Sequence, residues 1–209
     1  MKGILGILQQ KSQPDPVEGH LDSKLFATTF IGAGGDASLL VPWEARAVEV
    51  GATRLEPARG TRLLQALWAK DKHMSRLDLD AVSRMEPFID YAAVPAQRDL
   101  IRQDEQGNFM VVLLKGSIAV DRLQPWGERL RLTEAVPGEM LGEMSLLDGG
   151  VRFSVCTTLT DCEVAVLSAD AMDQMLGSDP ALTASLVTAL ARKLSLRLRV
   201  VSARLGEKK

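Results

Sequence analysis

The 209-residue sequence predicts an α+β fold, mainly β, in which an antiparallel β-roll or jelly-roll barrel has flanking N-terminal helices and a long C-terminal helix. Two patterns predict this fold. From Tyr91 to Ser168, short apolar or alternating runs are separated by turn residues, which is typical of antiparallel sheets and barrels. From Leu186 to Leu205, apolar residues recur at spacings of three and four, as on one face of a helix.

Residues 1–60 are expected to form an N-terminal extension that is partly irregular, because prolines and glycines interrupt any long element. The extension also contains Phe26, Phe30 and Trp43. Segments without structure usually lack such large apolar groups, so part of the extension is expected to pack on the main domain or on a partner.

Residues 61–74 are expected to form a linking helix and residues 75–209 the main domain. Between Thr61 and Lys70 the apolar positions fall on one helical face. Ser75 and Asp78 resemble a capping box, which would open a second helix running through Met85.

Six apolar or alternating runs are the expected strands: 91–94, 109–114, 117–123, 128–135, 153–158 and 163–167. A barrel of this size can hold one small ligand near its mouth. After the strands, residues 169–176 predict a short helix that Gly177 stops, and Ser178 or Asp179 then caps a long helix with Pro180 in its first turn.

The apolar stripe of the long helix exceeds what packing against a small barrel requires, so it is interpreted as a subunit seam of a homodimer. The alternative is that residues 1–60 fold back over it. The stripe consists of Leu186, Leu190, Leu194, Leu198, Val201 and Leu205. The basic residues near the same end are interpreted as a solvated face that complements the helix C-terminus, with an anionic partner as the alternative. They are Arg192, Lys193, Arg197, Arg199, Arg204, Lys208 and Lys209.

The composition is that of an ordinary globular protein, with 46% hydrophobic and 25% charged residues and a net charge of −2. The longest apolar run, Phe109 to Leu114, is too short to span a bilayer, and no signal-peptide pattern appears, so a cytoplasmic protein without a membrane span is expected.

Cys156 and Cys162 are expected to be free thiols, and on a hairpin that turns near residues 160–161 Cys156 would face Ala165. No metal-ligand spacing or catalytic motif is present, so no metal site and no enzyme is expected.

The most informative stretch runs from Gly138 to Arg152 and has the chemistry of a pocket for a small phosphorylated sugar. The Glu143 carboxylate can accept hydrogen bonds from a ribose hydroxyl, and the Arg152 guanidinium can meet a phosphate in a fork geometry. Gly142 lets the backbone approach a ligand closely. The backbone N–H groups of Met144 and Ser145 open a helical turn, which favours an anion.

This stretch resembles the phosphate-binding cassette of the cyclic-nucleotide-binding domain family. The family pattern is a Gly-Glu pair within an apolar hexapeptide, four spacer residues and then Pro-Arg, and here Gly142-Glu143 and Arg152 stand at that spacing. The resemblance covers roughly residues 75–205. It extends upstream over residues 94–120 and downstream over Ser154 to Ser168, which looks like the last hairpin of the family.

Two residues depart from the family pattern, Val151 in place of proline and Phe153 in place of a small or hydroxyl residue. Phe153 could stack on a purine, or it could fill the pocket and keep it empty. The ligand-binding residues that the resemblance implies are Gly142, Glu143, Met144, Ser145, Arg152 and Phe153, with a cyclic nucleotide as ligand, cAMP favoured, and no other cofactor.

The function implied is a cyclic-nucleotide-binding regulatory or sensor protein, in which ligand entry repositions the long helix and changes a surface for an unidentified protein partner. A ligand-free structural or adaptor protein built on the same fold is the alternative. A transcription factor of the catabolite-activator type is a third. Only four residues follow Leu205, too few for a DNA-reading helix, so DNA binding is not expected unless the chain is a fragment.

Overall fold

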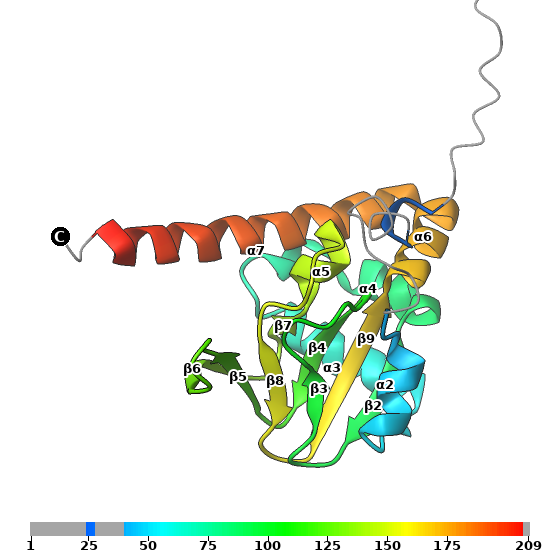
Figure 1. Ribbon diagram of the computed structural model, residues 1–209. Coiled ribbons are helices and arrows are strands. Elements are labelled where there is room, and N and C mark those ends of the chain that lie inside the picture. The colour runs from blue at the N-terminus through cyan, green and yellow to red at the C-terminus, as the bar shows by residue number, and fades with distance from the viewer. Residues whose placement is uncertain (1–23, 28–39, 207–209) are drawn as a thin grey trace, which may run out of the picture.

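A computed structural model describes residues 24–27 and 40–206, and two antiparallel sheets with helices on one side make up its body (Figure 1). The larger sheet has the order β1 (Thr53–Arg54), β2 (Asp90–Val94), β9 (Cys162–Ser168), β4 (Phe109–Lys115), β7 (Met140–Leu141). The smaller sheet has the order β3 (Asp99–Ile101), β8 (Val155–Thr158), β5 (Ile118–Leu123), β6 (Arg129–Ala135). The predicted jelly-roll architecture is confirmed, as two facing sheets rather than one closed barrel among the described strands.

Strand β4 lies at the centre of the fold and is buried on both faces. Phe109, Val111 and Leu113 point between the two sheets, where they join residues of β5 and β8. The alternate residues, Met110 and Val112 among them, join the helices on the other side. Since successive side chains of a strand face opposite sides, this double burial explains why the run is apolar without alternation.

The predicted hairpin from Ser154 to Ser168 is wrong, because its two strands belong to different sheets. Strand β8 pairs with β3 and β5, whereas β9 pairs with β2 and β4. Cys156 therefore lies opposite Val120, and Ala165 lies in the other sheet. Both cysteines are free and buried, as predicted. The turn between the strands is a corner, and the backbone N–H of Leu159 donates to the carbonyl of Ser117.

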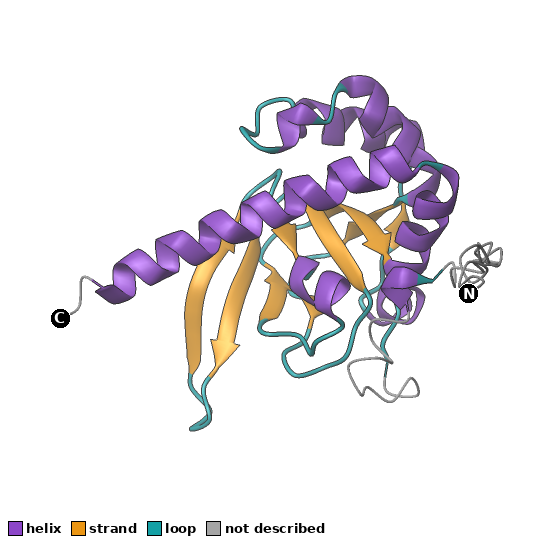
Figure 2. Cartoon of the chain, turned by 90° about the horizontal axis from the view of Figure 1, so that it is seen from above, coloured by secondary structure: helices purple, strands orange, loops and turns teal. Residues whose placement is uncertain are grey.

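The helices form a layer over the outer face of the larger sheet and around its edges (Figure 2). They are α2 (Trp43–Glu49), α3 (Pro57–Trp68), η2 (Met74–Arg76), α4 (Leu79–Met85), η3 (Glu86–Phe88), α5 (Glu143–Asp148), α6 (Ala169–Ser178) and α7 (Pro180–Gly206). Of the described residues, no helix is both long enough and apolar enough to cross a membrane.

Two helix starts differ from the prediction. Helix α3 begins at Pro57, because a proline suits the first turn of a helix, and it ends at Trp68. The capping box at Ser75 is wrong: Ser75 lies in the 3-10 turn η2, and Asp78 caps α4 by accepting a hydrogen bond from the Ala81 N–H at 2.7 Å. Aspartate is itself among the preferred N-cap residues, so it starts the helix without help from Ser75.

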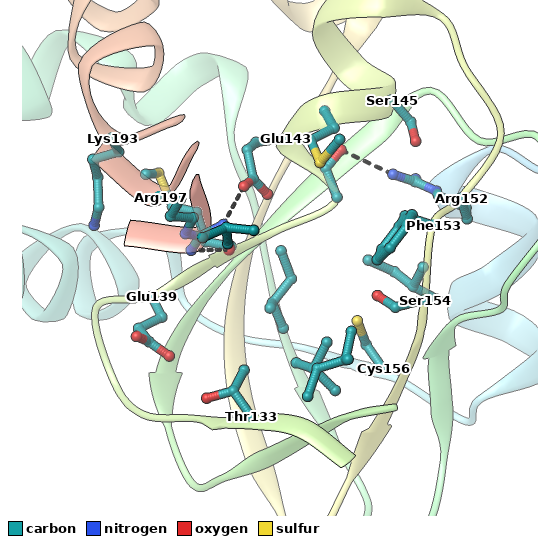
Figure 3. A pocket seen from close by; sticks show the side chains of 18 of the residues that line it. Thr133, Glu139, Glu143, Ser145, Arg152, Phe153, Ser154, Cys156, Lys193 and Arg197 are labelled. Carbon is teal, nitrogen blue, oxygen red and sulfur yellow. Dashed lines mark hydrogen bonds and ion pairs between the residues drawn. The ribbon is translucent and has the colours of Figure 1, made fainter. Parts of the chain in front are cut away.

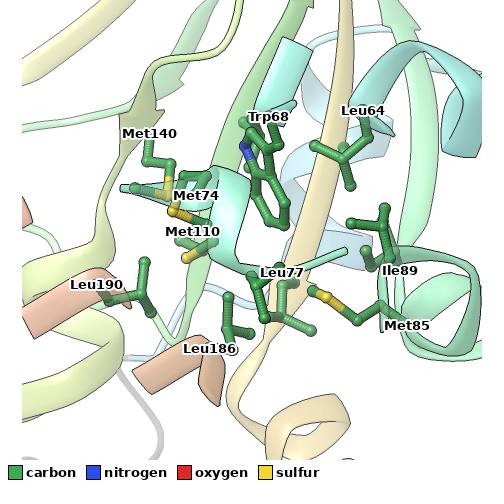
Figure 4. Packing of buried hydrophobic residues seen from close by; sticks show 14 of the residues in the cluster. Leu64, Trp68, Met74, Leu77, Met85, Ile89, Met110, Met140, Leu186 and Leu190 are labelled. Carbon is green, nitrogen blue, oxygen red and sulfur yellow. The ribbon is translucent and has the colours of Figure 1, made fainter. Parts of the chain in front are cut away.

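A second core joins α3, α4, α6 and the first half of α7 to the larger sheet (Figure 4). Trp68, Met110 and Leu186 are fully buried in it. Part of the N-terminal extension packs here as predicted: Phe26 contacts this core, and the backbone N–H groups of Phe26 and Ala27 both donate at 2.8 Å to the buried carboxylate of Asp173 in α6. Phe30 lies outside the described residues.

Helix α7 is divided between core and surface. Leu186 and Leu190 are fully buried, whereas Leu198 is 67% exposed and Val201 is also exposed. The C-terminal half of the helix runs over the ends of β5 and β6 and projects beyond α5 (Figures 1 and 2). The apolar stripe thus continues past the part of the helix that the domain itself covers. The side chains of Arg204 and Leu205, together with residues 207–209, lie outside the described part.

Candidate functional site

A cavity of about 660 Å³ lies between α5, the strands β5, β6 and β8, and helix α7 (Figure 3). All six predicted site residues line it: Gly142, Glu143, Met144, Ser145, Arg152 and Phe153. Apolar side chains such as Ile101, Val120 and Leu132 make up much of the remaining wall. A concave, mostly apolar cavity with a few convergent polar groups is the usual form of a small-molecule site.

The Arg152 guanidinium is held by the backbone of the cavity floor. It is 3% exposed, and it donates to the carbonyl oxygens of Gly142 at 2.9 Å and Phe109 at 2.6 Å. It also lies 4.7 Å from the centre of the Phe109 ring. Burial lowers the pKa of Arg152 to about 10, so the side chain stays cationic at neutral pH.

Two glycines, which have no Cβ atom, provide the space for the Arg152 side chain. Gly142 has a φ of +80°, and a Cβ there would stand 2.5 Å from Nη1 of Arg152. A Cβ at Gly107 would stand 2.7 Å from its Nε. The close approach expected at Gly142 is therefore an approach to Arg152 itself. Gly107 serves the same arginine, a role that sequence reasoning missed because it lies 45 positions upstream.

Glu143 begins α5, is 4% exposed, and forms an ion pair with Arg197 of α7 (Figure 3). Arg197 also donates to the Met140 carbonyl at 3.3 Å. The sequence predicts Arg197 as part of a solvated face; its side chain is 48% exposed, but its guanidinium pairs with a buried acid. Its position seven residues after the buried Leu190, on the same face of the helix, is the signal that was available.

A second ion pair fixes α7 beside the cavity. Lys193 donates to Asp71 at 2.7 Å, and Asp71 also accepts from the backbone N–H groups of His73 and Met74. Partial burial would raise the pKa of Asp71, but the hydrogen bonds from Lys193 and the two N–H groups prevail and lower it to about 2. Lys193 and His73 both line the cavity, so the ion pair holds α7 against the segment that contains His73.

The short helix α5 presents its first turn to the cavity. Glu143, Met144 and Ser145 occupy this turn, and N–H groups there have no acceptor within a helix. The Ser145 hydroxyl donates to the Val151 carbonyl at 3.4 Å, which ties the helix to the arginine loop. The turn can therefore accept an anion next to Arg152.

Phe153 lies at the cavity wall and does not fill it. The side chain is 55% exposed, and the Arg122 guanidinium stacks 4.4 Å from the ring centre and donates to the Phe153 carbonyl. One of the two alternatives for Phe153, a plugged pocket, does not fit this geometry. Cys156 lines the same wall, and burial raises the pKa of its thiol to about 12, so the thiol is neutral.

Residues 92–179 match the family model described as cyclic nucleotide-binding domain. Over these residues the chain is similar to the cyclic nucleotide-binding domain family. The match contains the whole stretch from Gly138 to Arg152, so the resemblance seen in the sequence is confirmed.

The domain is similar to named regulators. A CRP-like cAMP-activated global transcriptional regulator of Mycobacterium tuberculosis is 29% identical over 100 residues, 48% of this chain and 45% of that protein. The cAMP-activated global transcriptional regulator CRP of Haemophilus influenzae is 31% identical over 109 residues, 52% of this chain and 49% of that protein. The chain thus spans about half the length of the curated relatives it matches.

Solved structures show the same fold. A cyclic nucleotide-binding domain from Methylobacillus flagellatus superposes with a TM-score of 0.68 at 24% identity, covering 76% of this chain and 89% of that one.

Among the described residues, no cluster of three or more histidine, cysteine or acidic side chains is arranged to hold a metal ion.

Proposed function

We propose that this protein is a regulatory sensor that binds a cyclic nucleotide, cAMP in preference, in the cavity beside α5. Glu143 accepts a hydrogen bond from the ribose hydroxyl, and Arg152 and the first turn of α5 bind the cyclic phosphate. The single observation that carries the proposal is that all six cassette residues line one cavity whose far side is helix α7. The relatives named as cAMP-activated support the choice of cAMP.

The hydrogen bonding of Arg152 supports a phosphate ligand. A guanidinium has five N–H donors, and the carbonyls of Gly142 and Phe109 take two of them. The two bonds fix the plane of the group, and the other donors are suited to phosphate oxygens. A fixed, buried cation gives a stronger charge-assisted hydrogen bond than a mobile surface one.

The Glu143–Arg197 ion pair is the proposed connection from the ligand to α7. A ribose hydroxyl that hydrogen-bonds the Glu143 carboxylate competes with Arg197 for its oxygens. Because Arg197 lies in the C-terminal half of α7, a change in this pair changes the position of that half. The signal is therefore read on the exposed surface of α7 by a protein partner.

A homodimer through α7 belongs to the same proposal. Leu198, Val200 and Val201 are all exposed on the projecting half of the helix. Exposed large apolar side chains that gather on one segment often mark an interaction site, although Val200 and Val201 also line the cavity. A second copy of the same helix would cover it.

The second candidate function is a structural or adaptor protein that does not need a ligand. The observation in its favour is that both charged cassette residues have partners within the fold, Glu143 with Arg197 and Arg152 with two carbonyls. The cost of burying these groups is thus partly offset without a nucleotide.

A thermal-shift titration separates the two functions. Cyclic nucleotides (cAMP, cGMP and a cyclic dinucleotide) are added to the full-length chain, with AMP as the matched non-cyclic control. A ligand at a hundred times its dissociation constant stabilises the folded state by about 2.7 kcal/mol. The sensor proposal predicts a rise in melting temperature with cAMP and none with AMP. A melting temperature that none of the cyclic nucleotides changes would favour the adaptor.

A further inference from the structure

Helix α2 packs behind the arginine of the site. Its first residue, Trp43, is buried, and its ring meets the Phe109 ring edge-on, with centres 5.6 Å apart and planes at 62°. The same Phe109 ring lies 4.7 Å from the Arg152 guanidinium, and the Phe109 carbonyl accepts one of its hydrogen bonds. Trp43 thus fixes the residue on which the Arg152 side chain rests.

Arg46, one turn further along α2, holds the backbone beside Arg152. It is 1% exposed and forms ion pairs with Glu105 and with Glu49, the latter at 2.6 Å. The Glu105 carbonyl accepts the backbone N–H of Arg152 at 2.8 Å, and the Arg152 carbonyl accepts the N–H of Asp104 at 2.8 Å. Arg46 therefore anchors the segment that pairs with Arg152.

The residues just before α2 also pair, through their backbone, with the segment that lies beside Arg152. Leu40 pairs with Gln106 as a parallel bridge, and Gln106 pairs with Val151 as an antiparallel bridge. The N–H of Val41 donates to the Gln106 carbonyl at 2.9 Å. Residues 40–41, 104–106 and 151–152 thus lie side by side, with the arginine loop on one edge.

We infer that residues 40–49 form part of the nucleotide site by positioning the Arg152 guanidinium for the cyclic phosphodiester, with Trp43 and Arg46 as the positioning residues. The inference rests on the proposed function. Residues 40–49 precede the stretch that matches the family model, which begins at residue 92. A guanidinium binds a phosphate through a planar fork, so the orientation of the plane determines affinity. A segment that fixes both the ring and the backbone beneath the side chain fixes that plane.

The test measures cAMP affinity of the full-length chain by calorimetry. Trp43→Leu is expected to weaken binding about tenfold, and Arg46→Gln by a similar factor, because each loosens one support of Arg152. Trp43→Phe keeps an aromatic ring against Phe109 and is expected to restore most of the affinity. Val48→Ala, on the same helix at a side chain that is 84% exposed, is the matched control and should leave affinity unchanged.

A second background separates positioning from general loosening of the fold. Lysine keeps the charge of Arg152 but has no fork to orient, so Trp43→Leu should change affinity less than about twofold in an Arg152→Lys chain. An equal loss in both backgrounds would overturn the inference. So would wild-type affinity in both Trp43→Leu and Arg46→Gln.

Different results would refute the inference and the proposed function. A folded wild-type chain that binds no cyclic nucleotide removes both, whereas wild-type binding with unaffected α2 variants removes the inference alone. Circular dichroism melts establish that each variant is folded at the temperature of titration. If Trp43→Leu does not fold, Arg46→Gln decides the question, because it keeps the apolar core intact.

Discussion

Replacing Arg152 by alanine should lower both ligand affinity and the stability of the fold. The guanidinium hydrogen-bonds two carbonyls and contacts the Phe109 ring, and it is almost fully buried. Leaving buried carbonyls without a partner costs about 1–3 kcal/mol, and the lost ring contact adds about 0.5–1 kcal/mol. Removal of a buried charge offsets part of this, so we expect a net loss of about 2 kcal/mol in the free energy of unfolding.

Losing the charge-assisted bonds to the phosphate should cost at least about 2 kcal/mol of binding free energy, which is roughly thirtyfold in affinity. Urea unfolding measures the stability, and calorimetry with cAMP at a temperature where the variant is folded measures the affinity. Arg129→Ala, at an exposed position on β6, is the control and should change neither. An unchanged dissociation constant in Arg152→Ala would refute the phosphate assignment, and unchanged stability would refute its structural role.

Three further predictions follow from other parts of the structure. Phe153→Ala should weaken cAMP binding, since the ring lines an open cavity, and tighter binding measured by calorimetry would show that the ring blocks the pocket. Replacing Leu198 and Val201 by glutamate should convert a dimer to a monomer in light scattering without unfolding the domain, because both side chains are exposed; a wild-type monomer at tens of micromolar would contradict the dimer. The pKa of Asp71 is lowered from 3.8 to about 2, so its carboxylate stabilises the fold above pH 4 and this contribution disappears as the pH falls toward 2; Lys193→Met should flatten that part of the curve of unfolding free energy against pH.

The strands and the cassette could be predicted because their signals are local. All six predicted strand runs overlap observed strands, and the spacing from Glu143 to Arg152 placed the site residues on one cavity. The periodicity of a strand indicates which of its faces are buried, but it does not indicate which strand it pairs with. For this reason the sequence predicts one hairpin for β8 and β9, which belong to different sheets.

The partners of the site residues could not be predicted, because they come from distant parts of the chain. Arg197 is 54 residues from Glu143, and Trp43 reaches Arg152 only through Phe109. The two-residue strand β1 and the short helix α2 lie in a region where proline and glycine obscure any period. Charges at the surface of a long helix resemble solvated side chains until the fold shows which of them face a buried acid.

The most direct test of the account is a calorimetric titration of cAMP into the wild-type chain, with the Arg152→Ala and Glu143→Gln chains titrated in parallel. We expect saturable binding of one nucleotide per chain in the wild type, and weaker binding in both variants. A folded wild-type protein that shows no saturable heat up to about 1 mM cAMP would contradict it, since that limit corresponds to a binding free energy weaker than about −4 kcal/mol.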